Sequence, residues 1–482
     1  MSVLELDIST TPEALFRSIG GESGAFWIDG LAAGGATFMG CAAEAQLVLH
    51  ADGTLERDGS GRQEAPTGGV LAAIEAFVAE TAPLAGAHGA PRTIGFFAYD
   101  LAGLLEPTIR PRRDASCALP LARLARYDAV VEVVPARNAG DAGAQRVTAR
   151  IHATSPAAAE RCARVVCRAN PASPEPRGPA IACVPCIVEA PCEDAHVRAV
   201  ERALAYIAAG DVYQVNLAQR FRVRSDDAPA EVFLRLRAAQ RVPFASYLDC
   251  DGFSVLCGSP ERFVRIAGTT IETEPIKGTR PRADDPDDDT TLRAALVADP
   301  KERAEHVMIV DLERNDLGRI CAAGSVTVPS LMRVESFATL HHMVSTVRGT
   351  LRADVGLASV LRATFPGGSI TGAPKIRAAQ VIAELEARPR ELYTGAIAWF
   401  RGPRDFDSAI AIRTAIARDG IYTYHAGGGI VADSDPQREY AECLLKAVPF
   451  LRAVQVTLPG AHGTSSAPPD RARSAGAPGL PV

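Results

Sequence analysis

The stretch Glu274-Pro275-Ile276-Lys277-Gly278-Thr279-Arg280 places a single lysine where a predicted strand runs into a turn. Residues 259–266 and 269–274 are predicted to be strands, because the two residues between them, Ala-Gly, are typical of a two-residue hairpin. With this loop, Glu261 faces Glu274 across the hairpin. Lys277 then lies roughly 10 Å further along the strand, a distance that a lysine side chain can largely bridge. The pattern predicts that one carboxyl group and one amine converge.

Lys277 is the residue for which we predict chemistry. An amine is a nucleophile only when it is unprotonated, and burial or the nearby cations Arg280 and Arg282 would lower its pKa. Glu261 could then move protons during a reaction. The spacing alone also fits an exposed lysine in a turn, so the rest of the chain has to decide between the two interpretations.

The chain has 482 residues, of which 47% are hydrophobic and 22% charged, with a net charge of -6. This length is enough for two domains or for one large domain with subdomains. The mild acidity gives no support for a nucleic-acid or anionic-membrane partner. Residues 1–7 lack the basic and apolar segments of a targeting peptide, and no run of 18 apolar residues occurs, so we predict a cytoplasmic protein. The eleven cysteines have no regular spacing and are predicted to be reduced thiols.

Composition divides the chain into four segments. Residues 1–170 are rich in Ala and Gly and contain predicted strands but no catalytic constellation. Residues 171–190 begin in a proline-dense stretch and are predicted to be a linker. Residues 191–452 hold the motifs discussed below. Residues 453–482, rich in Gly, Ala, Ser and Pro, are predicted to be a disordered tail.

Two charged side chains stand where a partner is needed. In the predicted helix 299–318, Glu305 lies on an otherwise apolar face, so its carboxylate requires a salt bridge or a metal ion. Arg413 lies among small apolar residues of a predicted strand over residues 408–416 and could bind a carboxylate through both ends of its guanidinium group. An internal Asp or Glu could supply that carboxylate, and so could a substrate.

Two glycine-rich stretches are candidates for contact with a ligand. Residues 365–377, Phe-Pro-Gly-Gly-Ser-Ile-Thr-Gly-Ala-Pro-Lys-Ile-Arg, lead into a helix start, where free N–H groups favour anions. Their spacing matches neither the P-loop nor the dinucleotide fingerprint, so the pattern fits a carboxylate ligand at least as well as a phosphate. It also fits a purely structural turn. Residues 426–430, Ala-Gly-Gly-Gly-Ile, would let the backbone approach a ligand closely.

The last predicted helix begins near Ser434, which has Gln437 at capping-box spacing. Glu439, Glu442 and Lys446 follow at positions i, i+3 and i+7, which share one helix face. An exposed charged face is the ordinary interpretation. The alternative is a carboxylate pair presented to magnesium, which prefers oxygen ligands.

Taken together, these strings resemble the chorismate-utilising enzymes. The resemblance is dense over residues 194–452 and looser in the N-terminal region, where some relatives bind tryptophan. The matching strings lie at residues 95–101, 210–216, 259–262, 275–279, 304–312, 341–342, 366–375 and 427–433. The resemblance implies an α+β fold with two large stacked antiparallel β-sheets, helices packed outside and the site between the sheets.

Within this family the lysine discriminates between activities. Members that aminate chorismate at carbon 4, a reaction classed with the transaminases, read Pro-Ile-Lys-Gly-Thr, whereas anthranilate-forming members usually carry alanine in place of the lysine. By resemblance, Lys277 attacks carbon 2 of the ring and displaces the hydroxyl at carbon 4, ammonia adds at carbon 4, and the lysine leaves. Glu261 looks like the general acid and base for the departing hydroxyl. The implied product, 4-amino-4-deoxychorismate, leads to 4-aminobenzoate and folate.

The resemblance also implies a set of ligand-binding residues. Glu305 and Glu442 look like direct Mg²⁺ ligands, with Glu439 acting directly or through water. Gln214 would border the ring. The groups that look like substrate-binding groups are Gly278, Thr279, Thr371, Arg413, Gly428, Gly429 and Lys446.

Ammonia for this reaction needs a source. The chain lacks the Gly-x-Cys-x-Gly pattern of a glutamine amidotransferase, so the resemblance implies a separate glutaminase subunit, component II, that docks on it. Three alternatives stay open. They are an anthranilate-forming enzyme that also eliminates pyruvate, an enzyme that adds water to give isochorismate or salicylate, and a noncatalytic subunit that binds chorismate or tryptophan.

Overall fold

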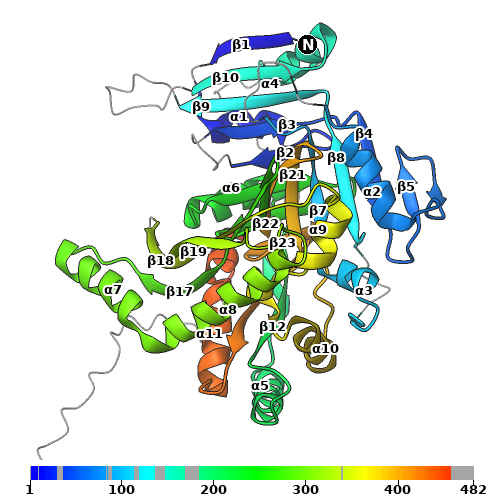
Figure 1. Cartoon of the computed structure of the whole chain (residues 1–482). Coiled ribbons are helices and arrows are strands. Elements are labelled where there is room, and N and C mark those ends of the chain that lie inside the picture. The colour runs from blue at the N-terminus through cyan, green and yellow to red at the C-terminus, as the bar shows by residue number, and fades with distance from the viewer. Residues whose placement is uncertain are drawn as a thin grey trace, which may run out of the picture.

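The computed structural model describes residues 2–8, 10–29, 36–82, 84, 90–112, 119–135, 147–168, 184–337 and 340–457. Its strands form two 12-stranded sheets in which every described pair is antiparallel (Figure 1). The first sheet runs β1 (Ser2–Ile8), β10 (Val147–Ala153), β9 (Ala129–Pro135), β3 (Thr37–Gly40), β2 (Phe26–Ile28), β13 (Phe244–Asp249), β14 (Ser254–Ser259), β23 (Thr414–Arg418), β24 (Ile421–Ile430), β12 (Gln214–Arg224) and β11 (Cys186–Glu189), with β20 (Gly372–Ala373) paired to β12.

The second sheet runs β17 (Ile276–Pro281), β19 (Leu340–Thr350), β16 (Thr270–Glu274), β15 (Arg262–Ala267), β22 (Asp405–Ile410), β21 (Ala396–Gly402), β7 (Thr93–Phe97), β8 (Ala122–Arg126), β4 (Ala45–Leu49), β5 (Leu55–Arg57) and β6 (Arg62–Gln63), with β18 (Thr327–Ser336) paired to β19. The two sheets pack face to face. Phe26 and Val255 of the first sheet share one buried cluster with Phe96 and Trp399 of the second. This cluster is the core between the sheets, as expected for stacked antiparallel sheets.

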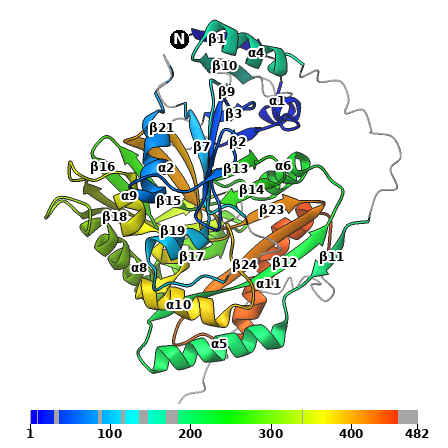
Figure 2. The same cartoon turned by 90° about the vertical axis from the view of Figure 1, so that its right-hand side faces the viewer.

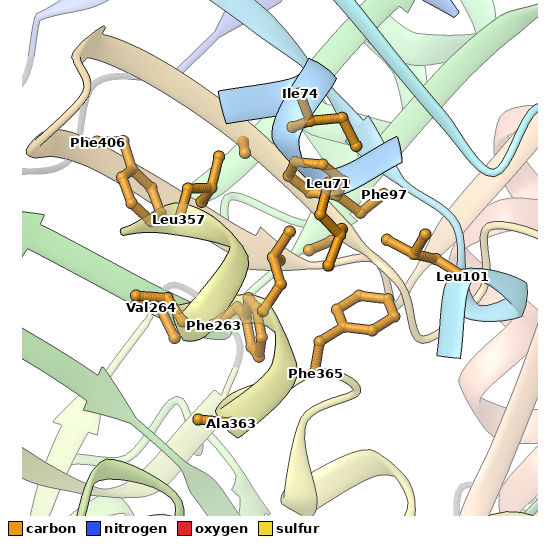
Figure 3. Packing of buried hydrophobic residues seen from close by; sticks show 14 of the residues in the cluster. Leu71, Ile74, Phe97, Leu101, Phe263, Val264, Leu357, Ala363, Phe365 and Phe406 are labelled. Carbon is orange, nitrogen blue, oxygen red and sulfur yellow. The ribbon is translucent and has the colours of Figure 1, made fainter. Parts of the chain in front are cut away.

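Helices cover the outer faces. The first sheet packs against α1 (Pro12–Ile19), α4 (Pro156–Val166), α6 (Pro229–Ala239) and α11 (Pro436–Ala453). The second packs against α2 (Gly69–Ala79), η1 (Tyr99–Leu101), α3 (Ala102–Leu105), α8 (Pro300–Gly318), α9 (Leu357–Thr364) and η2 (Gly368–Ile370), with apolar side chains of α2 and α9 meeting β7, β15 and β22 (Figure 3). Helix α10 (Lys375–Leu385) packs mainly against β12 of the first sheet, where Val381 shares a buried cluster with Val215 and Leu217. The remaining helices are α5 (Glu193–Ala208) and α7 (Pro286–Ala298). The predicted fold class is confirmed.

The N-terminal segment contributes strands to both sheets. β2 pairs with β13, and β7 pairs with β21, so each sheet runs continuously from the first part of the chain into the second. In Figure 2, α5 and α10 lie at the opposite end of the molecule from β1. The division at residues 171–190 stays a prediction, because residues 169–183 lie outside the described residues, as do residues 458–482 of the predicted tail. None of the helices described has the length and apolar character needed to cross a bilayer.

Two local expectations differ from the structure. In the β15–β16 hairpin, Ala267 faces Thr270, so the loop is Gly268-Thr269, one residue later than predicted, and Arg262 rather than Glu261 faces Glu274. Residues 408–416 do not form one strand. β22 ends at Ile410 in the second sheet and β23 begins at Thr414 in the first, so the chain crosses between the sheets at residues 411–413.

Candidate functional site

The predicted nucleophile and the predicted acid lie together at the start of β17. Lys277 is half-buried, and burial lowers the pKa of its ammonium group while the carboxylates of Glu261 and Glu305 oppose that shift. Glu261 is 4% exposed, and burial raises its pKa to about 7 against the opposing effects of the Ser369 hydroxyl and of Lys277. Glu261 Oε1 accepts hydrogen bonds from Ser369 Oγ at 2.6 Å and from Ile276 N–H at 3.4 Å. A carboxyl group poised to exchange a proton near neutral pH therefore stands beside an amine that deprotonates more readily than usual.

A bulge in β17 separates Lys277 from Thr279. The pairing of β17 with β19 shifts register between these two residues, and Gly278 between them has a φ of 81°. A Cβ atom on Gly278 would lie 2.9 Å from Leu296 Cδ1 and 3.1 Å from Glu302 Oε2. Glycine is therefore required here both for the left-handed backbone and for the close approach of α7 and α8.

Replacing Gly278 by alanine is expected to lower the free energy of unfolding by about 1–3 kcal/mol, because the left-handed backbone is unfavourable for a residue with a Cβ. Urea unfolding followed by circular dichroism measures this loss. Gly318→Ala is the matched control, because an added Cβ there meets nothing within 4 Å. Equal stability of the two variants would show that the bulge does not need glycine.

The three predicted metal ligands face the same region from two helices. Glu305 is a half-buried residue of α8, and Glu439 and Glu442 belong to α11. Burial raises the pKa of Glu305, and the carboxylate of Glu439 adds to this rise. For Glu442, burial is outweighed by the ammonium of Lys446, whose Nζ lies 2.7 Å from Oε1, so its pKa is lowered. The charges of Glu305 and Glu442 also act on Lys277, so these two carboxylates lie within electrostatic range of the amine.

The three carboxylates have the ligand type that a magnesium ion prefers, but they are not arranged as a metal-binding group. Among the residues that the structure describes, no three His, Cys, Asp or Glu side chains form a group that could hold a metal ion. The donors are nevertheless carboxylate oxygens, which Mg²⁺ prefers, and burial raises the pKa of both Glu305 and Glu439, so a cation there would compensate charge that the protein holds at a cost. Magnesium binding therefore stays a prediction.

The glycines of β24 lie against the side chains of Glu439, Lys446 and Gln214. A Cβ on Gly428 would lie 3.1 Å from Glu439 Oε2 and 3.7 Å from Lys446 Nζ, so these two side chains closely approach the glycine backbone. A Cβ on Gly429 would lie 2.8 Å from Gln214 Nε2. Gln214 is fully buried, and neither its Oε1 nor its Nε2 has a hydrogen-bond partner among the residues that the structure describes. A buried amide without partners is costly, and a ligand lying over the glycines would satisfy it.

Arg413 lies at the crossing between the two sheets. Its φ of 52° is unusual for a residue with a side chain. Its Nη1 donates to the carbonyl oxygen of Lys446 at 3.0 Å, and within the described chain no carboxylate forms an ion pair with it. The internal Asp or Glu partner considered for Arg413 is therefore not found there, and its guanidinium keeps donors for an anion.

The remaining predicted contacts are less direct. Thr279 is exposed, and its Oγ1 lies 3.0 Å from Nδ1 of His342. Thr371 is buried, and its hydroxyl donates to the carbonyl oxygen of Gly367 at 2.7 Å. Their predicted roles stay predictions.

Sequence reasoning assigned no role to two buried histidines at this site, although both lie in strings that carry the resemblance. Burial lowers the pKa of His342 to about 4, and the charge of Arg413 adds to the effect. Burial likewise lowers the pKa of His306 to about 4, and Lys277 contributes. His306 Nε2 lies 2.5 Å from Ser345 Oγ. Both histidines are therefore neutral near pH 7. His342 contacts the site through Thr279, and the charge of Lys277 acts on His306.

An amine, a carboxyl group whose pKa lies near neutrality, a guanidinium without a carboxylate partner among the described residues and a glycine-rich backbone are the groups expected of an enzyme site for a ligand that carries carboxylates. The chain belongs to the chorismate binding enzyme family, which it matches over residues 26–452. It is 43% identical over 265 residues to aminodeoxychorismate synthase component 1 of Bacillus subtilis, covering 55% of this chain and 56% of the relative. It is 46% identical over 257 residues to anthranilate synthase component 1 of Aquifex aeolicus, covering 53% of this chain and 52% of the relative.

The chain thus spans about half the length of these two curated relatives. Among solved structures, anthranilate synthase component I from Streptococcus pneumoniae superposes with a TM-score of 0.69 at 28% identity, over 87% of this chain and 93% of that one. The family and the fold are established by these matches. Identity to relatives with two different activities leaves the reaction to be argued from the site.

Proposed function

We propose that this protein aminates chorismate at carbon 4 to give 4-amino-4-deoxychorismate, the precursor of 4-aminobenzoate in folate synthesis. The observation that carries the proposal is the pair formed by Lys277, whose pKa burial lowers, and Glu261, whose pKa burial raises to about 7. A deprotonated amine can act as a nucleophile, which this reaction requires, or as a general base toward water, which the formation of isochorismate would require. The B. subtilis relative named aminodeoxychorismate synthase component 1 supports the same assignment.

The proposed reaction uses the two side chains in order. The neutral Lys277 amine forms a bond to carbon 2, the ring double bonds shift, and the hydroxyl at carbon 4 departs as water with the proton of Glu261. Ammonia then bonds to carbon 4, the double bonds shift back, and the bond between carbon 2 and Lys277 breaks. The ionised Glu261 takes up the proton released as the amines are restored, so one ammonia replaces one water.

The other site residues would bind and orient chorismate. Arg413, the Gly428 and Gly429 backbone and Lys446 present donors to the carboxylates, and the Gln214 amide borders the ring. Glu305, Glu439 and Glu442 would hold Mg²⁺, which when bound supplies positive charge to a ring carboxylate and polarises the leaving group. Ammonia would come from a glutaminase partner, in keeping with the name component 1 of several relatives.

The test is mass-resolved chromatography after the purified chain is incubated with chorismate, Mg²⁺ and an ammonium salt at mildly alkaline pH. The expected product is chorismate with its carbon-4 hydroxyl replaced by an amine, which a pyridoxal-phosphate lyase converts to 4-aminobenzoate. Anthranilate and pyruvate would instead assign the activity named for the A. aeolicus relative. Binding of chorismate without consumption would point to a noncatalytic subunit.

Glu442→Ala is expected to raise the Mg²⁺ concentration for half-maximal rate by about tenfold or more, because one carboxylate of the proposed ligand set is lost. A Mg²⁺ titration of chorismate consumption measures the shift. Glu160→Ala is the control, because it removes an exposed carboxylate from α4, which packs against β9 and β10 and not against the helices of the site. An unchanged Mg²⁺ requirement in Glu442→Ala would remove Glu442 from the ligand set.

A further inference from the structure

A second group of charged side chains is buried behind Glu261, and the proposed reaction does not use it. Glu313 and Asp316 of α8 are 4% and 3% exposed. Asp316 is compensated, because Lys375 Nζ lies 2.5 Å from its Oδ2 and also donates to the carbonyl oxygen of Thr364 at 2.8 Å. Glu313 instead accepts a hydrogen bond from the N–H of Gly368 at 3.3 Å. A carboxyl group buried in this way is retained at a cost.

The bond from Gly368 connects Glu313 with the proposed acid. Gly368 begins the short helix η2, and the next residue, Ser369, donates its hydroxyl to Glu261 Oε1 at 2.6 Å. Two consecutive residues of η2 therefore hold two different buried carboxyl groups. One faces the reaction, and the other lies in α8.

The whole glycine-rich loop is fastened to α8. At its start, Gly368 approaches α8 so closely that a Cβ would lie 2.5 Å from Leu312 Cδ2. At its end, the ammonium group of Lys375 forms an ion pair with Asp316. Glu313 is the α8 side chain that binds the part of the loop carrying Ser369. Its loss would remove one of the hydrogen bonds that hold η2, beside the one from Arg390 to the carbonyl oxygen of Ile370, and would let the Ser369 hydroxyl shift.

We propose that Glu313 is a positioning residue, which holds η2 through the N–H of Gly368 and so keeps the Ser369 hydroxyl directed at Glu261. This role rests on the function proposed above, in which Glu261 protonates the departing hydroxyl. Small displacements of a proton donor are costly, since about 1 Å can reduce a rate by roughly 10²-fold.

The role requires an acceptor oxygen and not a negative charge. Burial and, to a lesser degree, the neighbouring Asp316 raise the pKa of Glu313 to about 8 against the opposing charge of Lys375, so near neutral pH the side chain is largely protonated. A neutral carboxyl group still offers its carbonyl oxygen to the Gly368 N–H. Glutamine, which has the same length and a carbonyl oxygen in the same place, should replace it.

The test compares two variants of nearly equal size, Glu313→Gln and Glu313→Met. The full chain is assayed for the rate of chorismate loss with Mg²⁺ and ammonium. Glu313→Gln should keep kcat within about twofold of the original protein. Glu313→Met should lower kcat by about ten- to a hundredfold while KM for chorismate changes less than about threefold, because the substrate-binding groups stay in place.

A double-mutant cycle with Ser369→Ala tests the pathway from Glu313 to Glu261. If Glu313 acts through Ser369, the double variant Glu313→Met/Ser369→Ala should be no slower than Ser369→Ala alone. Losses that multiply, or a Glu313→Met variant with an unchanged kcat, would overturn the proposal. So would a Glu313→Gln variant as slow as Glu313→Met, because that result would make the proton or charge essential.

Two further measurements keep the outcome clear. Thermal unfolding reports whether Glu313→Met is folded, and Glu313→Leu replaces it if it is not. Chorismate loss is counted whatever the product, so an anthranilate product would contradict the proposed function while the cycle still decides the role of Glu313.

Discussion

Replacing Lys277 by alanine is expected to lower the rate of 4-amino-4-deoxychorismate formation by about 10³-fold or more, because the variant lacks the nucleophile that opens the reaction. The half-buried position and the lowered pKa make Lys277 the described amine best prepared for this role. The measurement is product formation from chorismate, Mg²⁺ and ammonium by mass-resolved chromatography. A rate equal to that of the original protein would reduce Lys277 to a bystander.

Lys277→Arg separates nucleophilicity from charge. Arginine keeps a cation near Glu261 and Glu305, but its guanidinium stays protonated and cannot attack carbon 2. We expect this variant to be as inactive as Lys277→Ala while still binding chorismate by titration calorimetry. Recovery of activity in Lys277→Arg would mean that the positive charge, rather than the amine, is what the reaction needs.

An adduct provides evidence independent of turnover. Without ammonia, the bond between Lys277 and the ring should persist in part of the protein. The mass of the intact protein should then increase by the mass of chorismate less one water. Lys277→Ala should show no such increase. A similar adduct on both proteins would place the covalent bond on another side chain.

The local alternation of residues was enough to predict the hairpin near Lys277 but not its register. Ala267-Gly268 is a good two-residue turn, yet the structure uses Gly268-Thr269 and accommodates the shift with an irregularity between Arg262 and Arg265. Glu261 reaches the site because it precedes β15, where Ser369 and the Ile276 N–H hold it, and not because it faces Glu274. A one-residue bulge depends on how the strand packs against its neighbours, so the alternation of residues along the strand cannot predict it.

Other parts of the site depended on contacts between distant segments. The largely apolar stretch over residues 408–416, which includes Arg413, predicts one strand, but residues 411–413 carry the chain from one sheet to the other and place Arg413 at the crossing. On α8, the predicted apolar face included Glu305, whereas the structure also buries His306 and Glu313. Whether a polar residue is buried depends on hydrogen-bond partners such as Gly368 that lie far away in the sequence. The spacing of residues along the helix therefore cannot predict it.

Replacing Glu261 by glutamine is the other change with a large expected effect. The amide cannot give a proton to the departing hydroxyl, and loss of a positioned general acid typically costs about 10²–10⁴-fold in rate. The variant should stay folded, because Gln can still accept the hydrogen bond from Ser369. Glu261→Asp is the matched control, since it keeps an acid on a shorter side chain and should recover part of the rate.

The pH dependence gives this prediction its sharpest form. Burial raises the pKa of Glu261 to about 7, so the acid is protonated below that pH and its protonated fraction falls about tenfold for each pH unit above it. In the original protein, kcat/KM should therefore show an alkaline limb that begins near pH 7, whereas the residual rate of Glu261→Gln should lack it. A limb that persists unchanged in Glu261→Gln would assign it to another group.

Stability should move in the opposite direction from activity. A carboxyl group whose pKa is raised on folding loses its proton more readily in the unfolded chain, so it stabilises the fold least above the folded-state pKa. Glu261→Gln, which cannot ionise, should consequently have a thermal midpoint at pH 8 at least as high as that of the original protein. The opposite result would be a thermal midpoint of Glu261→Gln that is lower than that of the original protein at pH 8 and equal to it at pH 5. It would indicate that attraction between the ionised carboxylate and a cation such as Lys277 outweighs the cost of burying the charge.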